Sequence, residues 1–195
     1  MKSRVLAALL ACVSMLAGAD LTVVGDFSTQ YAGYTLDHSL NAAFTNYVDL
    51  PYTFVRSMVY TNADASNYIY MYQVTNMNFI STLHSFSAAD FDGLTANTTI
   101  GYITGTVPAD FLANGNVPVS GGAHDKTIEF SFEIPPMLYS AVLFVESPYL
   151  PGIITGYLQN GGHSSGLVLG AVIPEPATMG LLLFGSLLAA RRRRA

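Results

Sequence analysis

The residues with the clearest chemical pattern form the segment Gly162-His163-Ser164-Ser165-Gly166, which fits the G-x-S-x-G pattern of a hydrolase nucleophile elbow. In that elbow a strand precedes the serine, a helix follows it, and the acid and the histidine of the triad come later in the chain. Here no histidine follows His163, and the only later acid is Glu175. We therefore interpret the segment as a small-residue hairpin loop. We predict no catalytic residue and a protein that is not an enzyme, with a hydrolase that uses Ser164 or a carboxylate pair as the weakest alternative.

The histidines and aspartates give little support for a metal site. The segment Asp90-Phe91-Asp92-Gly93 begins like a calcium loop, but the oxygen ligands expected at the later positions of such a loop are absent. We predict no cofactor and no specific metal site, and we name Asp90 and Asp92 as the candidate ligands for a loosely bound Ca²⁺ ion. The histidines lack metal-ligand spacing and are interpreted as loop or surface residues; they are His38, His84, His124 and His163.

Carboxylates and tyrosines could serve carbohydrate chemistry. Glu129 and Glu133 lie on the wet face of one predicted strand, roughly 13 Å apart at about 3.3 Å per residue, which is too far for either usual glycosidase mechanism. Tyr68, Tyr70 and Tyr72 share one face of another predicted strand, where they could stack on sugar rings if they were exposed. We predict instead that these three tyrosines fill the core.

The N-terminal end has the composition of a signal peptide. Lys2 and Arg4 form a basic region, residues 5–16 form an apolar core, and an A-x-A-like cleavage site contains Ala17 and Ala19. We predict that the general secretion machinery exports the chain and that cleavage follows Ala19, so residues 1–19 are the signal peptide. A lipoprotein signal that ends at Cys12 is the alternative.

The C-terminal end has three parts in a fixed order. Pro174-Glu175-Pro176 comes first, the uncharged run 177–190 follows, and Arg191, Arg192, Arg193 and Arg194 close it. Basic residues beside an apolar segment stay on the cytoplasmic side. As a helix the 14-residue run spans roughly 21 Å, against about 30 Å of hydrocarbon. Residues 174–195 therefore suit a sorting signal with a short transmembrane helix that is recognised and then removed.

This three-part tail resembles the PEP-CTERM sorting domain of Gram-negative bacteria, and the resemblance covers residues 172–195. The resemblance implies that exosortase, a membrane-embedded transpeptidase-like enzyme, processes a precursor held in the inner membrane. Many members of that family are linked to extracellular polysaccharide and biofilm. An ordinary short C-terminal membrane anchor is the alternative. The resemblance implies how the protein is delivered and leaves the activity of the rest of the chain open.

Between the two ends lies the body, residues 20–173, whose 154 residues suit a single domain. Its only basic residues are Arg56 and Lys126, against 12 acids, so its formal net charge is 2 − 12 = −10. Such a body lacks the cations that neutralise phosphates, which excludes nucleic-acid binding. The only cysteine, Cys12, leaves with the signal peptide, so disulfides, thiol catalysis and cysteine metal sites are excluded as well.

The body has the pattern of an all-β protein, and we predict a single antiparallel β-sandwich of jelly-roll or immunoglobulin-like type. The run 126–134 alternates apolar and polar residues and predicts a half-buried strand, whereas 67–76 is apolar on both faces and predicts a covered one. Residues 29–45 could form a short helix or a strand and loop, and Ser87 could cap a helical turn over 87–92. The remaining predicted strands are 21–27, 47–60, 79–86, 98–107, 141–146, 153–159 and 167–173.

The body also weakly resembles the compact β-sandwich domains of PEP-CTERM proteins, through the strand 67–76 and the run 134–147. We therefore predict a protein of the cell envelope, outer surface or extracellular matrix of a Gram-negative bacterium, with a structural or adhesive role in the envelope or biofilm. The alternative is a carbohydrate-binding module for extracellular polysaccharide.

Overall fold

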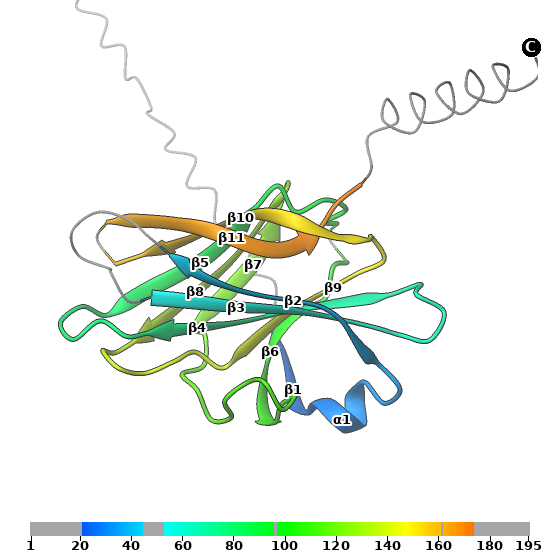
Figure 1. The fold of residues 1–195 in the computed structure, drawn as a ribbon, viewed down its shortest axis with the longest axis horizontal. Coiled ribbons are helices and arrows are strands. Elements are labelled where there is room, and N and C mark those ends of the chain that lie inside the picture. Colours follow the sequence, from blue (N-terminus) through cyan, green and yellow to red (C-terminus); the bar gives the residue numbers. More distant parts are fainter. Residues whose placement is uncertain (1–20, 45–52, 96, 161, 174–195) are drawn as a thin grey trace, which may run out of the picture.

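A computed structural model describes residues 21–44, 53–95, 97–160 and 162–173 of the chain. These residues form two β-sheets and one helical turn, α1 (Phe27–Gln30) (Figure 1), which confirms the all-β prediction. The six-stranded sheet has the order β1 (Thr22–Asp26), β6 (Ile100–Thr106), β9 (Val142–Ser147), β4 (Tyr68–Asn76), β3 (Thr53–Thr61) and β2 (Thr35–Phe44). The five-stranded sheet has the order β11 (His163–Ala171), β10 (Pro151–Gln159), β5 (Leu83–Ala89), β8 (Thr127–Ile134) and β7 (Ser120–His124).

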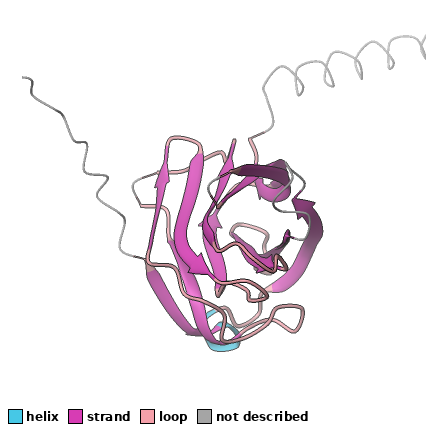
Figure 2. Cartoon of the chain, turned by 90° about the vertical axis from the view of Figure 1, so that its left-hand side faces the viewer, coloured by secondary structure: helices cyan, strands magenta, loops and turns pink. Residues whose placement is uncertain are grey.

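The two sheets enclose a common core, and the strands surround this interior in Figure 2. Strand β8 alternates between buried and accessible positions, as its sequence predicts, and its apolar side chains enter the core. Strand β4 lies inside the six-stranded sheet and is buried on both faces, as predicted, because the core covers one face and a second apolar cluster covers the other.

The second cluster lies beneath α1, on the outer face of the six-stranded sheet. Asp26 begins this helix by accepting hydrogen bonds from the backbone N–H groups of Ser28 and Thr29. Phe27 and Tyr31 then pack with the side chains of β3, β4 and β9. The Tyr31 hydroxyl donates to Glu146 Oε1 at 2.7 Å, which ties this segment to β9. Of the alternatives left open for residues 29–45, the strand and loop is correct, because α1 ends at Gln30 and the strand β2 follows a short turn.

The prediction of a wholly antiparallel arrangement is wrong, because β1 pairs with β6 in parallel. Two glycines of β6 permit this pairing at close range. A Cβ atom at Gly101 would lie 1.9 Å from the carbonyl oxygen of Thr22, and one at Gly105 would lie 1.9 Å from that of Gly25. The choice between a jelly-roll and an immunoglobulin-like arrangement stays a prediction.

Other local predictions also differ from the fold. The helical turn predicted over 87–92 is wrong, because Ser87 belongs to β5 and Asp90 has a positive φ of 62°. Strand β7 was not predicted, because its sequence, SGGAH, has the composition of a turn. Its extended conformation comes from antiparallel pairing with β8.

The molecule has two ends, which we name for use below. The tail end contains Leu150 and the last described residues, Val172 and Ile173, at the right of Figure 1. The loop end, at the opposite ends of the strands, includes the described connections 77–82, 107–119 and 135–141. Strand β4 runs from the tail end at Tyr68 to the loop end at Asn76, so the two ends lie at opposite ends of the sheets.

The described residues include no helix with the length and apolar character needed to cross a membrane. The predicted signal peptide helix, 1–19, and the predicted transmembrane helix within 174–195 both lie outside the described residues.

Candidate functional site

The point where the C-terminal tail leaves the body is held by backbone and carboxylate contacts. The N–H of Val172 donates to the carbonyl oxygen of Leu150 at 2.9 Å. The N–H of Ile173 donates to Asp92 Oδ2 at 2.9 Å, and Lys126 Nζ lies 2.7 Å from Asp92 Oδ1. Lys126 and the Ile173 N–H both hold the pKa of the Asp92 carboxyl below its usual value. Asp92 therefore fixes the start of the tail on the body.

The same contacts change the interpretation of the predicted calcium candidates. Both oxygens of Asp92 are engaged by the protein itself, and Asp90 is exposed with a left-handed backbone at the end of β5. Within the described ranges, no group of three or more His, Cys, Asp or Glu side chains could hold a metal ion. The structure therefore gives Asp92 a structural role that its sequence context did not indicate.

The residues predicted to direct sorting and cleavage lie outside the described part of the chain. Their roles therefore stay predictions. These residues are Ala17, Ala19, Pro174, Glu175, Pro176, Arg191, Arg192, Arg193 and Arg194.

Ser164 lies inside β11, so the hairpin loop predicted for the G-x-S-x-G segment is wrong from His163 onward. The strand continues through Gly166 and is paired along its length with β10. A Cβ atom at Gly166 would lie 2.7 Å from the ring of Phe44, so the glycine makes room for that ring. Ser164 is only 1% exposed, and among the described residues no helix follows it. The geometry of a nucleophile elbow is therefore absent from this segment.

Ser164→Ala is expected to raise the free energy of unfolding by about 1 kcal/mol, because a buried hydroxyl without a partner costs about 1–3 kcal/mol. Among the described residues, the buried Ser164 Oγ has no hydrogen-bond partner. Urea denaturation of the variant measures the change. The matched control is Ser165→Ala, at an exposed position next along β11, where we expect a change near zero. A Ser164→Ala variant that is less stable than the wild type would contradict the prediction.

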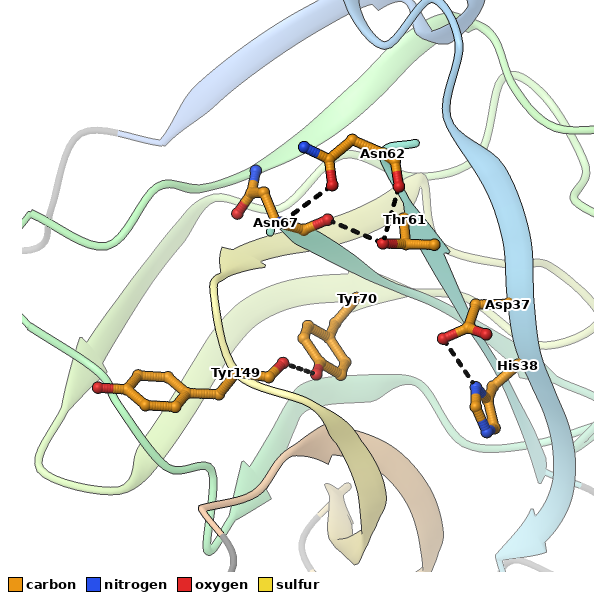
Figure 3. Close-up of polar contacts among 7 residues, drawn as sticks. All are labelled: Asp37, His38, Thr61, Asn62, Asn67, Tyr70 and Tyr149. Carbon is orange, nitrogen blue, oxygen red and sulfur yellow. Dashed lines mark hydrogen bonds and ion pairs between the residues drawn. The ribbon is translucent and has the colours of Figure 1, made fainter. Parts of the chain in front are cut away.

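The four histidines lie apart in the structure, and all four are exposed, as predicted. His38 pairs with the neighbouring Asp37 at 3.1 Å (Figure 3), and His124 pairs with the neighbouring Asp125 at 3.2 Å. His163 begins β11, and His84 belongs to β5.

Tyr68, Tyr70 and Tyr72 are buried in the core, as predicted, so they cannot form a sugar-stacking platform. The Tyr70 hydroxyl donates to the carbonyl oxygen of Tyr149 at 2.6 Å (Figure 3). The Tyr72 hydroxyl donates to that of Leu169, also at 2.6 Å. Each hydroxyl thereby ties β4 to a segment from the second half of the chain.

A polar cavity of about 470 Å³ lies along the five-stranded sheet. Glu129 and Glu133 line it and are exposed, as their place on the wet face of β8 predicts. Strands β5 and β10 add His84, Ser85 and Gln159 to the same cavity. Sequence reasoning missed Ser85 and Gln159 and did not place His84 beside the glutamates, because these positions depend on which strands pair with β8 and β5.

The comparison with protein families finds the PEP-CTERM protein-sorting motif at residues 172–194. This confirms the recognition made from the Pro-Glu-Pro triplet, the apolar run and the arginines. The motif implies an exported protein whose membrane-anchored precursor is a target of exosortase. No curated protein and no solved structure matches this chain. The match begins at Val172, so it covers the sorting signal and not the body.

Proposed function

We propose that the body is a non-enzymatic structural or adhesive module, which the sorting motif delivers to the cell surface or the extracellular matrix of a Gram-negative bacterium. The observation that supports this proposal is the direct connection between the motif and the body. The first two motif residues, Val172 and Ile173, are hydrogen-bonded to Leu150 and Asp92. No spacer therefore separates the last strand of the body from the matched motif.

The distribution of reactive groups agrees with a non-enzymatic role. Ser164 is buried in a strand, and the four histidines lie on separate surface segments. A fluorophosphonate probe tests this point on the exported protein. We expect no labelling of Ser164, whereas specific labelling that Ser164→Ala abolishes would show a serine hydrolase.

The sorting step is tested by replacing Pro174-Glu175-Pro176 with three alanines. We expect a precursor of unchanged mass that stays in the membrane fraction, because exosortase no longer recognises the tail. Immunoblots of the membrane and released fractions measure the mass and location of the protein. Pro135→Ala, an exposed proline of the body, is the control and should be processed normally. Normal release of the triple variant would refute the role of this motif.

The structural or adhesive role is tested by deleting the gene in the producing bacterium. We expect weaker attachment between cells or to a surface, restored by the wild-type chain and by Ser164→Ala. Unchanged attachment of the deletion strain would contradict this role.

Carbohydrate binding is the second candidate, and the cavity along the five-stranded sheet is the observation in its favour. Glu129, Gln159 and the serine hydroxyls beside them could bond to sugar hydroxyl groups. Tyr157, which is 41% exposed on β10, follows Glu129 and Ser87 in one cross-strand row and could stack on a sugar ring. Binding of acidic and neutral polysaccharides by the exported protein, and its loss in Tyr157→Ala, would favour this candidate. Absence of binding to all of them would remove it.

A further inference from the structure

The first two residues of the sorting motif, Val172 and Ile173, are bonded to the body on two sides. On one side the N–H of Val172 donates to the carbonyl oxygen of Leu150, which continues the pairing of β11 with β10. On the other side the N–H of Asp92 donates to the carbonyl oxygen of Ala171 at 2.9 Å, and Asp92 Oδ2 accepts from the N–H of Ile173. We call these three hydrogen bonds the clasp. They engage the backbone of the chain directly before the Pro-Glu-Pro triplet.

Tyr70, a buried residue of β4, supports both sides of the clasp. Its ring packs edge-on against the ring of Phe91, the residue before Asp92, with centroids 5.1 Å apart. Its hydroxyl donates to the carbonyl oxygen of Tyr149, the residue before Leu150 (Figure 3). The two segments that hold the start of the tail are therefore fixed by the folded core.

The clasp also engages one of the two basic residues of the body. Residues 20–173 contain only Arg56 and Lys126 as basic residues, and the Arg56 side chain donates to the carbonyl oxygen of Asp110. Lys126 Nζ instead lies 2.7 Å from Asp92 Oδ1. The Lys126 side chain is 67% exposed, so this ion pair adds little stability by itself. Its effect is to hold the Asp92 carboxylate in the orientation in which Oδ2 accepts from the Ile173 N–H.

The clasp leaves only a short length of chain for an enzyme to reach. Four peptide units separate Ile173 from Ala177, the first residue of the uncharged run, and they span at most about 14 Å. An enzyme that binds the motif as an extended chain uses its backbone N–H and carbonyl groups. The backbone groups of residues 171–173 that the clasp engages cannot bond to an enzyme at the same time. The closed clasp therefore competes with an enzyme that binds the motif from Val172 onward.

We propose that the clasp must open before exosortase can process the sorting motif, and that Asp92 is the residue that holds it closed. The apparent affinity of an enzyme for a site that is accessible only in a minor state is reduced in proportion to the population of that state. The folded body therefore prolongs the membrane-anchored stage of the protein. This inference rests on the sorting role of the motif, which the triple-alanine variant described above tests separately.

Pulse labelling of the full chain in the producing cells tests the clasp. Asp92→Ala removes the carboxylate that accepts from the Ile173 N–H. We expect the half-time of processing to become about threefold to tenfold shorter, because the open state gains population when a hydrogen bond to a charged group is lost. Glu129→Ala, which removes one negative charge at an exposed position of β8, is the control and should be processed at the wild-type rate. An unchanged or longer half-time in Asp92→Ala would overturn the inference.

An insertion gives the enzyme access to the motif while the clasp stays closed. The sequence Gly-Ser-Val-Ile, inserted between Ile173 and Pro174, provides the triplet with a second Val-Ile pair that the body does not hold. We expect this variant to be processed as fast as Asp92→Ala, and the two changes together to be no more than about twofold faster than either alone. The same insertion after Phe79, which is 73% exposed at the loop end, is the matched control and should not change the rate. Wild-type or slower processing of the tail insertion, or additive effects of the two changes, would overturn the inference.

Unfolding of the whole body could also speed processing, and Val74→Ala tests this explanation. Val74 is fully buried in β4 toward the loop end, so its truncation destabilises the body away from the clasp. We expect Val74→Ala to be processed at the wild-type rate, and an acceleration as large as that of Asp92→Ala would overturn the inference. If Asp92→Ala has no effect while the triple-alanine variant stays unprocessed, the clasp fails and the sorting function stands. Normal processing of the triple-alanine variant would refute the sorting function itself.

Discussion

Asn76→Asp is expected to lower the free energy of unfolding by about 3–5 kcal/mol near neutral pH, although the two side chains have nearly the same size. The amide of Asn76 donates to the carbonyl oxygens of Ser81, Ile134 and Pro135, and its Oδ1 accepts from the Asn78 N–H. A carboxylate at this position keeps the acceptor and loses the donor. It would direct negative charge at three carbonyl oxygens in a site that is fully buried.

The pH dependence of this variant has a definite sign. Burial and the facing carbonyl oxygens raise the pKa of the introduced carboxyl in the folded state, above the value of about 3.9 expected in the unfolded chain. Below about pH 4 the carboxyl is protonated in both states and its penalty is smallest. The stability deficit relative to the wild type then grows as the pH rises toward the folded-state pKa, because the folded state binds more protons than the unfolded state.

Urea denaturation at several pH values between 3 and 8 measures this deficit, with Asn97→Asp as the control at an exposed position. We expect the control to change stability by less than about 0.5 kcal/mol. A deficit in Asn76→Asp that is the same at every pH would show that the introduced carboxyl is not buried as the structure places it.

The wild-type protein is expected to unfold steeply in alkaline solution, losing about 4 kcal/mol of stability for each pH unit above about 10. Burial raises the pKa of Tyr31, Tyr70 and Tyr72 well above the usual value, and for Tyr31 the hydrogen bond to Glu146 raises it further. Above pH 10 the unfolded chain loses these three protons and the folded protein keeps them. Stability therefore falls with rising pH, by about 1.4 kcal/mol per pH unit for each tyrosine.

Chemical denaturation between pH 9 and 11.5, followed by circular dichroism, measures the slope. Tyrosinate absorbance should report the buried tyrosines only when the protein unfolds, and the chain has no tryptophan to complicate that signal. Tyr72→Phe should reduce the slope by about a third, whereas Tyr157→Phe, at an exposed position, should leave it unchanged. Ionisation of all tyrosines near pH 10, with the fold intact, would contradict the burial of these three residues.

The sequence alone reveals some of the structural features behind these predictions and not others. The alternation in β8 and the apolar pattern of β4 follow a period of two residues, so both strands and the burial of Tyr68, Tyr70 and Tyr72 were predictable. By contrast, the run around Ser164 has the small residues of a loop and was predicted as one. It forms a strand because pairing with β10 and the approach of Phe44 outweigh local propensity.

The sequence by itself determined the sorting signal, the charge of the body and its all-β class, because composition, linear motifs and short periods are local properties of a chain. Only the tertiary structure decided the parallel pairing of β1 with β6, the role of Asp92 at the start of the tail, and the approach of Phe44 to Gly166. Each of these joins residues far apart in the chain; Asp92 and Ile173, for example, are 81 residues apart. Such contacts depend on which strands pair and how the two sheets pack, and no local pattern of residues records that choice.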